Sequence, residues 1–266
     1  MVKTEGNMPF ISINLSEAFS CFLSPGNRNR SIDYPGDRNA SIKDIIESLG
    51  VPHTEIGRIS VQDKDVDFTF IPKSRDAVKV YPVDVPFDVT ISSLLRPEPL
   101  SRVSFFVDLN VGKLALLLRI LGIDTKSGPD LDDKEIALKV EKEKRILLSK
   151  DIGLLKRKNI IFGRHVRAIF PDDQLKEVLD HFGLKGPFDL FSLCLRCNRK
   201  TLIVNKEDII DRLEPLTIKY FDHFKICPCC ERIYWQGTHH EEMKKRLSRV
   251  GISTPPLLVN HSIDNG

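Results

Sequence analysis

The central fold is decided by residues 104–151, which read SFFVDLNVGKLALLLRILGIDTKSGPDLDDKEIALKVEKEKRILLSKD. Two short apolar runs, 104–107 and 145–149, each precede an aspartate, and helical periodicity fills the chain between them. This alternation is typical of β-α-β units in a parallel sheet. Asp108 and Asp151 are therefore expected at the carboxyl ends of two strands. Ligands of open α/β sheets bind at that edge, because the loops converge there.

Asp132 and Asp133 are expected to open the helix between the two strands. Each acid has a simpler explanation, since aspartate favours turns, caps helices and complements the helix dipole. Acids that converge on one edge would repel one another unless a hard cation such as Mg²⁺ or Mn²⁺ neutralised them. Such a site suits phosphodiester hydrolysis. Asn110 could add a neutral oxygen or orient the phosphate, or it could serve only a turn.

The segment after the second strand is basic, with one acid, Asp151, between residues 150 and 167. A run of charge often marks a plain solvated face, but a basic rim beside an acidic pocket is also what a polyanionic substrate requires. The candidate substrate-binding residues are Lys150, Lys156, Arg157, Lys158, Arg164 and Arg167.

The N-terminal part has the order strand, strand, helix and three further strands, which fits a β-grasp fold. The expected strands are PFISINL, SIDY, RISVQ, VDFTF and AVKVYPV, and Ser41 is expected to cap a helix that ends before Gly50. Residues 85–101 contain three prolines and are expected to form a linker that packs through Phe87, Leu94 and Leu95.

The cysteines are concentrated near the C-terminus, where five of the six lie between residues 194 and 230. Two C-x-x-C pairs, Cys194 with Cys197 and Cys227 with Cys230, match the knuckles of a tetrahedral structural Zn²⁺ site. Cys229 is then a bystander. Tyr234 and Trp235 could stack on a base or close the small core of a zinc ribbon. His239 and His240 offer a weaker rival metal pair.

The composition describes a globular chain of two or three domains, with 41% hydrophobic and 29% charged residues among 266 and a net charge of +3. No apolar run approaches the about 18 residues of a membrane span, and MVKTEGNMPF lacks an apolar signal core. A cytoplasmic protein with no membrane partner is therefore expected.

Several segments resemble the Mut-seven-C family: ASIKDIIESLGVPHTEIGRISV (40–61) and AVKVYP (77–82) resemble its ubiquitin-like domain. FFVDLNVGKLALLLRILGIDT (105–125), DDKEIALKVEKEKRILLSKDIGLLKRK (132–158), CLRC (194–197) and CPCCERIYWQGTHHEEM (227–243) resemble its PIN-like nuclease domain and zinc ribbon. The resemblance implies an α/β protein with a parallel PIN-like sheet between an N-terminal β-grasp domain and a C-terminal zinc ribbon. The expected parts are a ubiquitin-like domain (9–84), a linker (85–101), a nuclease domain (102–184), a zinc ribbon (190–243) and a disordered tail (250–266).

The resemblance further implies a ribonuclease dependent on Mg²⁺ or Mn²⁺, whose site acids are Asp108, Asp133 and Asp151. PIN-like sites often hold a fourth acid soon after the third. This chain has Gly153 and Leu154 there, so Asp132 is the candidate for the missing carboxylate. The expected partners are RNA and a protein bound by the ubiquitin-like domain. The alternative is a non-catalytic RNA-binding adaptor with a degenerate nuclease fold, and DNA is not distinguished from RNA at this stage.

Overall fold

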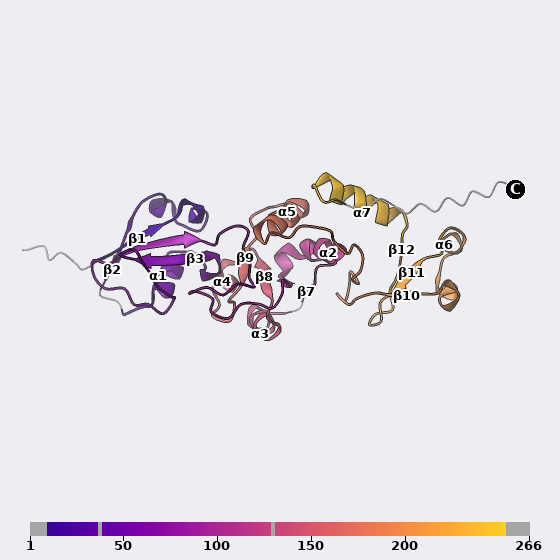
Figure 1. Ribbon diagram of the computed structural model, residues 1–266, viewed down its shortest axis with the longest axis horizontal. Coiled ribbons are helices and arrows are strands. Elements are labelled where there is room, and N and C mark those ends of the chain that lie inside the picture. The colour runs from indigo at the N-terminus through magenta and orange to yellow at the C-terminus, as the bar shows by residue number, and fades with distance from the viewer. Residues whose placement is uncertain (1–9, 37–38, 129–130, 254–266) are drawn as a thin grey trace, which may run out of the picture. The chain divides into compact units, whose positions relative to one another are not determined.

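The computed structural model describes residues 10–36, 39–128 and 131–253, apart from the side chains of Thr238 and His239. The chain forms two compact units, shown as a ribbon in Figure 1. The first comprises residues 1–115 and 124–184, and it holds both the β-grasp sheet and the parallel sheet. The second comprises residues 116–123 and 185–266 and holds the cysteines of both C-x-x-C pairs.

The N-terminal sheet has the strand order β2-β1-β5-β3-β4, in which β1 pairs parallel with β5 and the other neighbours are antiparallel. Ser41 caps α1 by accepting a hydrogen bond from the Asp44 N–H, and Gly50 follows the helix with a φ of +117°. The predicted β-grasp fold is confirmed. Its elements are β1 (Phe10–Leu15), β2 (Ile32–Pro35), α1 (Ile42–Ser48), β3 (Ile56–Val61), β4 (Lys64–Asp65) and β5 (Ala77–Pro82).

The strand predicted over VDFTF is wrong, because β4 ends at Asp65 and residues 66–70 form a turn. The Asp67 carboxylate accepts hydrogen bonds from the N–H and hydroxyl of Thr69, which closes the turn. Val66, Phe68 and Phe70 still pack against the core. Their alternation therefore reflects burial of one side of a turn and not strand pairing.

The central sheet is parallel throughout, with the order β7-β6-β8-β9. Helices α3 and α5 lie on opposite faces of it (Figure 1). Phe106 and Leu147 pack with Ile136 of α3, whereas Phe105 contacts Phe182 at the end of α5. The elements are β6 (Phe105–Val107), α2 (Gly112–Ile120), β7 (Thr125–Ser127), α3 (Asp133–Glu143), β8 (Ile146–Ser149), α4 (Ile152–Leu155), β9 (Gly163–His165) and α5 (Pro171–His181).

The parallel α/β fold is confirmed, but two of its strands differ from the prediction. NIIF and VRAIF were expected as strands, and the structure instead places one strand, β9, between them. The short strand β7 lies in a stretch, TKS, that carries no apolar run. β7 is part of the sheet because Thr125 and Ser127 pair with Phe105 and Val107 of the buried β6.

The segment 85–101 is packed against the first unit over much of its length. Phe87 lies beside the rings of Phe162 and Phe182, and Val89 and Leu95 are buried. Leu94, by contrast, is 55% exposed, so the prediction that it packs inward is wrong.

The second unit contains an antiparallel sheet in the order β10-β11-β12. A disordered tail was predicted from residue 250. Residues beyond 253 lie outside the described residues, and among residues 250–253 Ile252 is buried. Across the described ranges, the helices are too short or too polar to span a bilayer. The elements are β10 (Leu202–Val204), α6 (Pro215–Tyr220), β11 (Phe224–Ile226), β12 (Ile233–Trp235) and α7 (Thr238–Arg249).

Candidate functional site

The carboxyl edge of the parallel sheet brings two of the predicted aspartates together. Val107 pairs with Leu148, so Asp108 and Ser149 are the next residues on adjacent strands. The Ser149 hydroxyl donates to Asp108 Oδ2 over 2.7 Å and accepts a hydrogen bond from the Asp151 N–H over 2.8 Å. One serine oxygen therefore contacts both the Asp108 carboxylate and the Asp151 backbone.

Asn110 completes this connection from the loop after β6. Its side-chain N–H donates to Asp108 Oδ2 over 2.7 Å, and its Oδ1 accepts a hydrogen bond from the Lys150 N–H over 3.1 Å. The loops that follow β6 and β8 are thus tied to each other. Ser149 was not predicted as a site residue. It is fully buried at the last position of an apolar strand, and the sequence alone does not distinguish it from other serines at strand ends.

Asp151 also caps α4, because its Oδ1 accepts a hydrogen bond from the Leu154 N–H over 3.0 Å. Asp108 Oδ1 accepts in the same way from the Leu109 N–H over 2.6 Å. No hydrogen bond to Asp151 Oδ2 occurs within the described ranges, and Asp151 is exposed. Each carboxylate thus caps the turn that follows it and keeps lone pairs available for a further ligand.

Asp132 and Asp133 begin α3 as predicted. Asp132 forms a capping box with Glu135: its carboxylate accepts from the Glu135 N–H over 2.8 Å, and Glu135 accepts from the Asp132 N–H over 3.0 Å. Asp133 Oδ2 lies 3.6 Å from an Arg157 guanidinium nitrogen. Among the described residues, the acids do not form a group of three whose ligand atoms lie within 4.8 Å of one another.

The six predicted basic residues fall into two sets. The side chains of Arg157 and Lys158 are exposed, and Lys150 is half-buried at the site edge. Lys156 instead donates to the Glu47 carbonyl in α1 over 2.6 Å, and burial lowers the pKa of its ammonium. Arg164 is 9% exposed, and Arg167 donates to the Ala18 carbonyl. Lys156, Arg164 and Arg167 therefore serve contacts with the β-grasp part.

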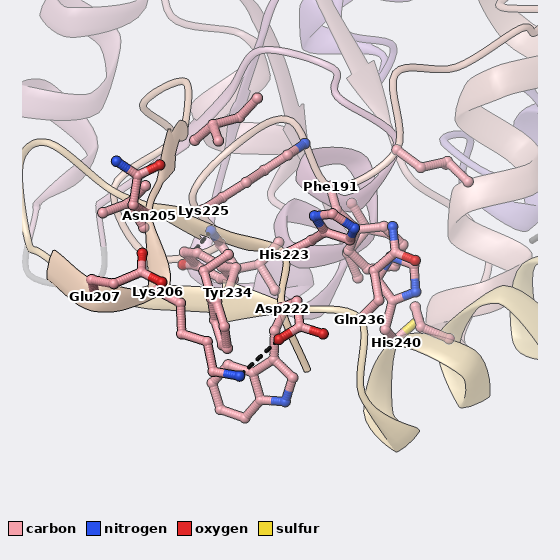
Figure 2. Close-up of a pocket in the computed structure, with 18 of the residues that line it drawn as sticks. Phe191, Asn205, Lys206, Glu207, Asp222, His223, Lys225, Tyr234, Gln236 and His240 are labelled. Carbon is pink, nitrogen blue, oxygen red and sulfur yellow. Dashed lines mark hydrogen bonds and ion pairs between the residues drawn. The ribbon is translucent and has the colours of Figure 1, made fainter. Parts of the chain in front are cut away.

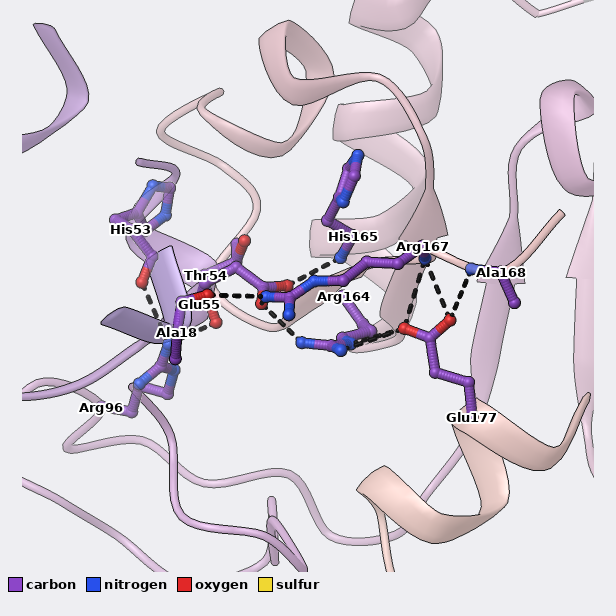
Figure 3. Close-up of polar contacts among 10 residues, drawn as sticks. All are labelled: Ala18, His53, Thr54, Glu55, Arg96, Arg164, His165, Arg167, Ala168 and Glu177. Carbon is purple, nitrogen blue, oxygen red and sulfur yellow. Dashed lines mark hydrogen bonds and ion pairs between the residues drawn. The ribbon is translucent and has the colours of Figure 1, made fainter. Parts of the chain in front are cut away.

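Glu55 is the centre of those contacts, as Figure 3 shows. It follows α1 on the β-grasp side, is 3% exposed, and accepts from Arg164 Nη1 over 2.6 Å and from the His165 N–H over 2.7 Å. Burial raises the pKa of the Glu55 carboxyl, and Arg164 opposes that shift. Glu177 of α5 binds the other side of Arg164 over 3.0 Å. This ionic cluster fixes β9 to the β-grasp sheet.

Arg96, in the segment expected as a linker, is 2% exposed and was not predicted to have any role. Its guanidinium donates to the backbone carbonyl of Ile56 over 2.8 Å. It also donates to the carbonyls of Thr54 and His53 over 3.0 and 3.2 Å (Figure 3). Burial lowers its pKa to about 10. The segment 85–101 is therefore part of the contact between the two sheets.

His165 ends β9 directly opposite Ser149. Its ring lies edge-on to Phe22 of the β-grasp part, and its Nδ1 is buried without a hydrogen-bond partner among the described residues. Burial, with Arg167 and Arg164 nearby, lowers the pKa of the imidazole. A neutral ring is thus favoured beside the acidic edge.

The four predicted cysteine ligands converge in the second unit. The Sγ atoms of Cys194, Cys197, Cys227 and Cys230 all lie within 4.8 Å of one another, and those of Cys194 and Cys230 are 3.6 Å apart. A tetrahedron with metal–sulfur bonds of about 2.3 Å has sulfur–sulfur edges of about 3.8 Å. The four cysteines can therefore hold a metal ion such as zinc.

The two knuckles have the same backbone geometry. The Cys194 N–H donates to the Arg199 carbonyl over 2.7 Å, and the Cys227 N–H donates to the Arg232 carbonyl over 3.0 Å. The residue four places after the first cysteine is left-handed in both, with φ of 57° at Asn198 and 55° at Glu231. Such matched turns present both sulfurs of each pair to one ion.

Three further predictions concern residues near the cysteines. Cys229 is exposed and outside the cysteine group, as expected for a bystander. The Tyr234 hydroxyl lies 3.1 Å from Cys194 Sγ and accepts from the Leu195 N–H over 3.1 Å, so it braces a knuckle. His240 stacks on Phe191 with ring centroids 3.8 Å apart, and the side chain of His239 lies outside the described residues.

Comparison with known families agrees with this architecture. Residues 103–247, more than half of the chain, match the Mut7-C RNAse domain, and residues 8–88 match the Mut7-C ubiquitin domain. Comparisons with curated proteins and with solved structures give no significant match. The family supports a nuclease-related or RNA-related function. The chain belongs to the Mut7-C RNAse family and carries the family's ubiquitin-like domain ahead of the RNAse domain.

Proposed function

We propose that this protein is a metal-dependent ribonuclease that hydrolyses RNA phosphodiester bonds at the carboxyl edge of its parallel sheet. The observation that carries the proposal is the link from Asp108 through Ser149 to Asp151 within the matched RNAse domain. Independent turn or cap residues would not require the hydrogen bond between the buried Ser149 hydroxyl, at the end of β8, and the Asp108 carboxylate, which follows β6.

The donor set suits a hard divalent cation. Asp108 and Asp151 offer carboxylate oxygens, as Mg²⁺ and Mn²⁺ require, and Asp133 and Asp132 can add others from the start of α3. When bound, such an ion lowers the pKa of a water molecule and offsets charge on phosphate oxygens. The Asp133–Arg157 pair is largely exposed, so it contributes little stability and can open to free the carboxylate.

The remaining residues orient and attract the substrate. Ser149 and Asn110 hold the Asp108 carboxylate in one rotamer, which limits the reorganisation needed on binding. Lys150, Arg157 and Lys158 supply positive charge for the RNA backbone. The reaction is attack of water on phosphorus in line with the departing bridging oxygen, with no covalent enzyme intermediate. Arg164, Arg167 and Lys156 act instead through the contact with the β-grasp part.

The test is cleavage of end-labelled single-stranded RNA in the presence of Mn²⁺, with and without a chelator. Asp108→Asn keeps the shape of the side chain and removes its charge, so we expect the cleavage rate to fall at least about a hundredfold. Ser149→Ala removes only the orienting hydroxyl and should cost about ten- to a hundredfold. Asp180→Asn is the matched control, because Asp180 is an exposed acid near the C-terminal end of α5. Its cleavage rate should equal that of wild type.

A second candidate is an RNA-binding adaptor whose nuclease site has decayed. It is favoured by the absence, within the described ranges, of three acids in mutual contact and by the pairing of Asp133 with Arg157. An adaptor would bind RNA and leave it intact with every cation tested. If wild type and Asp108→Asn are equally inactive under conditions that retain RNA binding, the adaptor replaces the enzyme.

A further inference from the structure

The second unit contains a cavity of about 640 Å³ whose lining includes none of the predicted aspartates and none of the four cysteine ligands. It is lined by the three strands β10, β11 and β12 with the residues that adjoin them, by the start of α7, by residues within 190–195 and by Leu116 and Ile120 of α2, all within the second unit. In Figure 2, Asn205 and Glu207 lie on one side, Phe191, Gln236 and His240 on the other, and Tyr234 between them. Its volume is within the range of about 300–1,000 Å³ typical of small-ligand sites.

Aromatic rings form one part of the cavity wall, and aliphatic side chains form another. Trp235 is 40% exposed and rests at a tilt on Phe224, with ring centroids 6.4 Å apart. Phe191 and His240 stack on each other nearby. An indole exposed inside a cavity offers a flat apolar surface that water solvates poorly. A planar ring from a ligand is the natural partner for such a surface.

Polar groups around these rings match the edge and the backbone of a nucleotide. Gln236 has an amide without a hydrogen-bond partner in the described part of the chain, and an amide can both donate and accept at a base edge. The Lys225 ammonium has no ion pair there either, and Lys206 is held at the wall by Asp222 over 2.7 Å (Figure 2). A lipid or a purely apolar peptide would leave these groups without partners.

We infer that this cavity binds an unstacked base of single-stranded RNA, with Trp235 as the stacking platform and Lys225 beside the adjoining phosphate. The inference rests on the proposed function for its ligand class and adds a binding site to it. Base stacking on an aromatic side chain tolerates any base, so the site holds RNA without selecting a sequence. Base pairing hides the faces of the bases, and a duplex should therefore bind poorly.

The chain has one tryptophan, so its fluorescence reports directly on the cavity. The first measurement uses Asp108→Asn protein, without added Mg²⁺ or Mn²⁺, titrated with a ten-nucleotide single-stranded RNA. We expect saturable quenching of Trp235 and much weaker quenching by the same sequence as a duplex. Absence of quenching by the single strand would overturn the inference.

The second measurement is the anisotropy of a labelled RNA with variants of the cavity. Trp235→Ala should weaken binding about tenfold or more, and Trp235→Phe, which keeps a stacking face, by no more than about threefold. Lys225→Gln should lower the salt dependence of binding by about one phosphate contact. Zinc content checks that each variant is folded. Equal affinity of all variants for RNA would contradict the assignment. That result is also the one expected if the cavity binds a peptide along β10 instead.

The two proposals fail separately. Quenching without cleavage by wild type would refute the nuclease and leave the base site standing. Cleavage that is unchanged by Trp235→Ala, together with absent quenching, would refute the base site and leave the nuclease standing.

Discussion

We propose that the four cysteines bind zinc, and replacing Cys227 with serine is then expected to abolish zinc binding and unfold the ribbon. Zinc content should fall from about one ion per chain to near zero. The reason is that each strand of this sheet is three residues long, whereas structural zinc binding is worth about 10–16 kcal/mol near pH 7. Without the ion, the four sulfurs and their knuckles lose the interaction that holds them together. Elemental analysis and hydrogen exchange of peptides from β10 to β12 measure both effects.

Cys229→Ser is the matched control, because this thiol lies between two ligands in sequence and outside the sulfur group in space. It should keep the zinc and the exchange protection. Loss of zinc from Cys229→Ser, or its retention by Cys227→Ser, would show that the ligand set is assigned wrongly.

Replacing Glu55 with alanine is expected to destabilise the first unit by about 3–5 kcal/mol, the usual cost of breaking a buried ion pair from one side. The change leaves the Arg164 guanidinium with Glu177 alone and removes the acceptor of the His165 N–H. The loss should appear as faster hydrogen exchange in peptides that cover β3 and β9.

Lys176→Ala provides the comparison, since Lys176 and Asp180 form an exposed ion pair at 3.0 Å. Removing an exposed pair of this kind costs at most about 1 kcal/mol. A Glu55→Ala effect as small as that of Lys176→Ala would mean that the ionic cluster does not hold the two sheets together. A large effect would give the ubiquitin-like domain a structural task, in addition to the partner binding that we predict for it.

Local chemistry made much of the fold predictable. Ser41 and Asp132 cap their helices, and Asp108 and Asp151 follow apolar runs, so adjacent residues are enough to place them. The turn over VDFTF was missed because Val66, Phe68 and Phe70 alternate as they would in a strand, although Asp67 and Thr69 close a turn there. The polar strand β7 was missed because it depends on its pairing with β6.

The candidate site also combines features that local sequence predicts with features that depend on distant residues. The spacing of the cysteines predicted the metal group, because two knuckles are local structures. The basic run was only partly understood from sequence, since nothing near Arg164 reveals that its partner is Glu55, 109 residues away. Ser149 was missed because a serine at a strand end has no distinctive pattern until the neighbouring strand brings Asp108 beside it.

The central claim is that Asp108, Asp151 and Asp133 share a divalent cation, and Mn²⁺ binding measured by electron paramagnetic resonance tests it most directly. Zinc-loaded wild type is titrated with Mn²⁺ beside Asp108→Asn, Asp151→Asn, Asp133→Asn and the control Asp180→Asn. The account predicts Mn²⁺ binding by wild type and Asp180→Asn that is weakened at least about tenfold in each of the other three. Equal Mn²⁺ binding by all five proteins, or none by wild type, would contradict it.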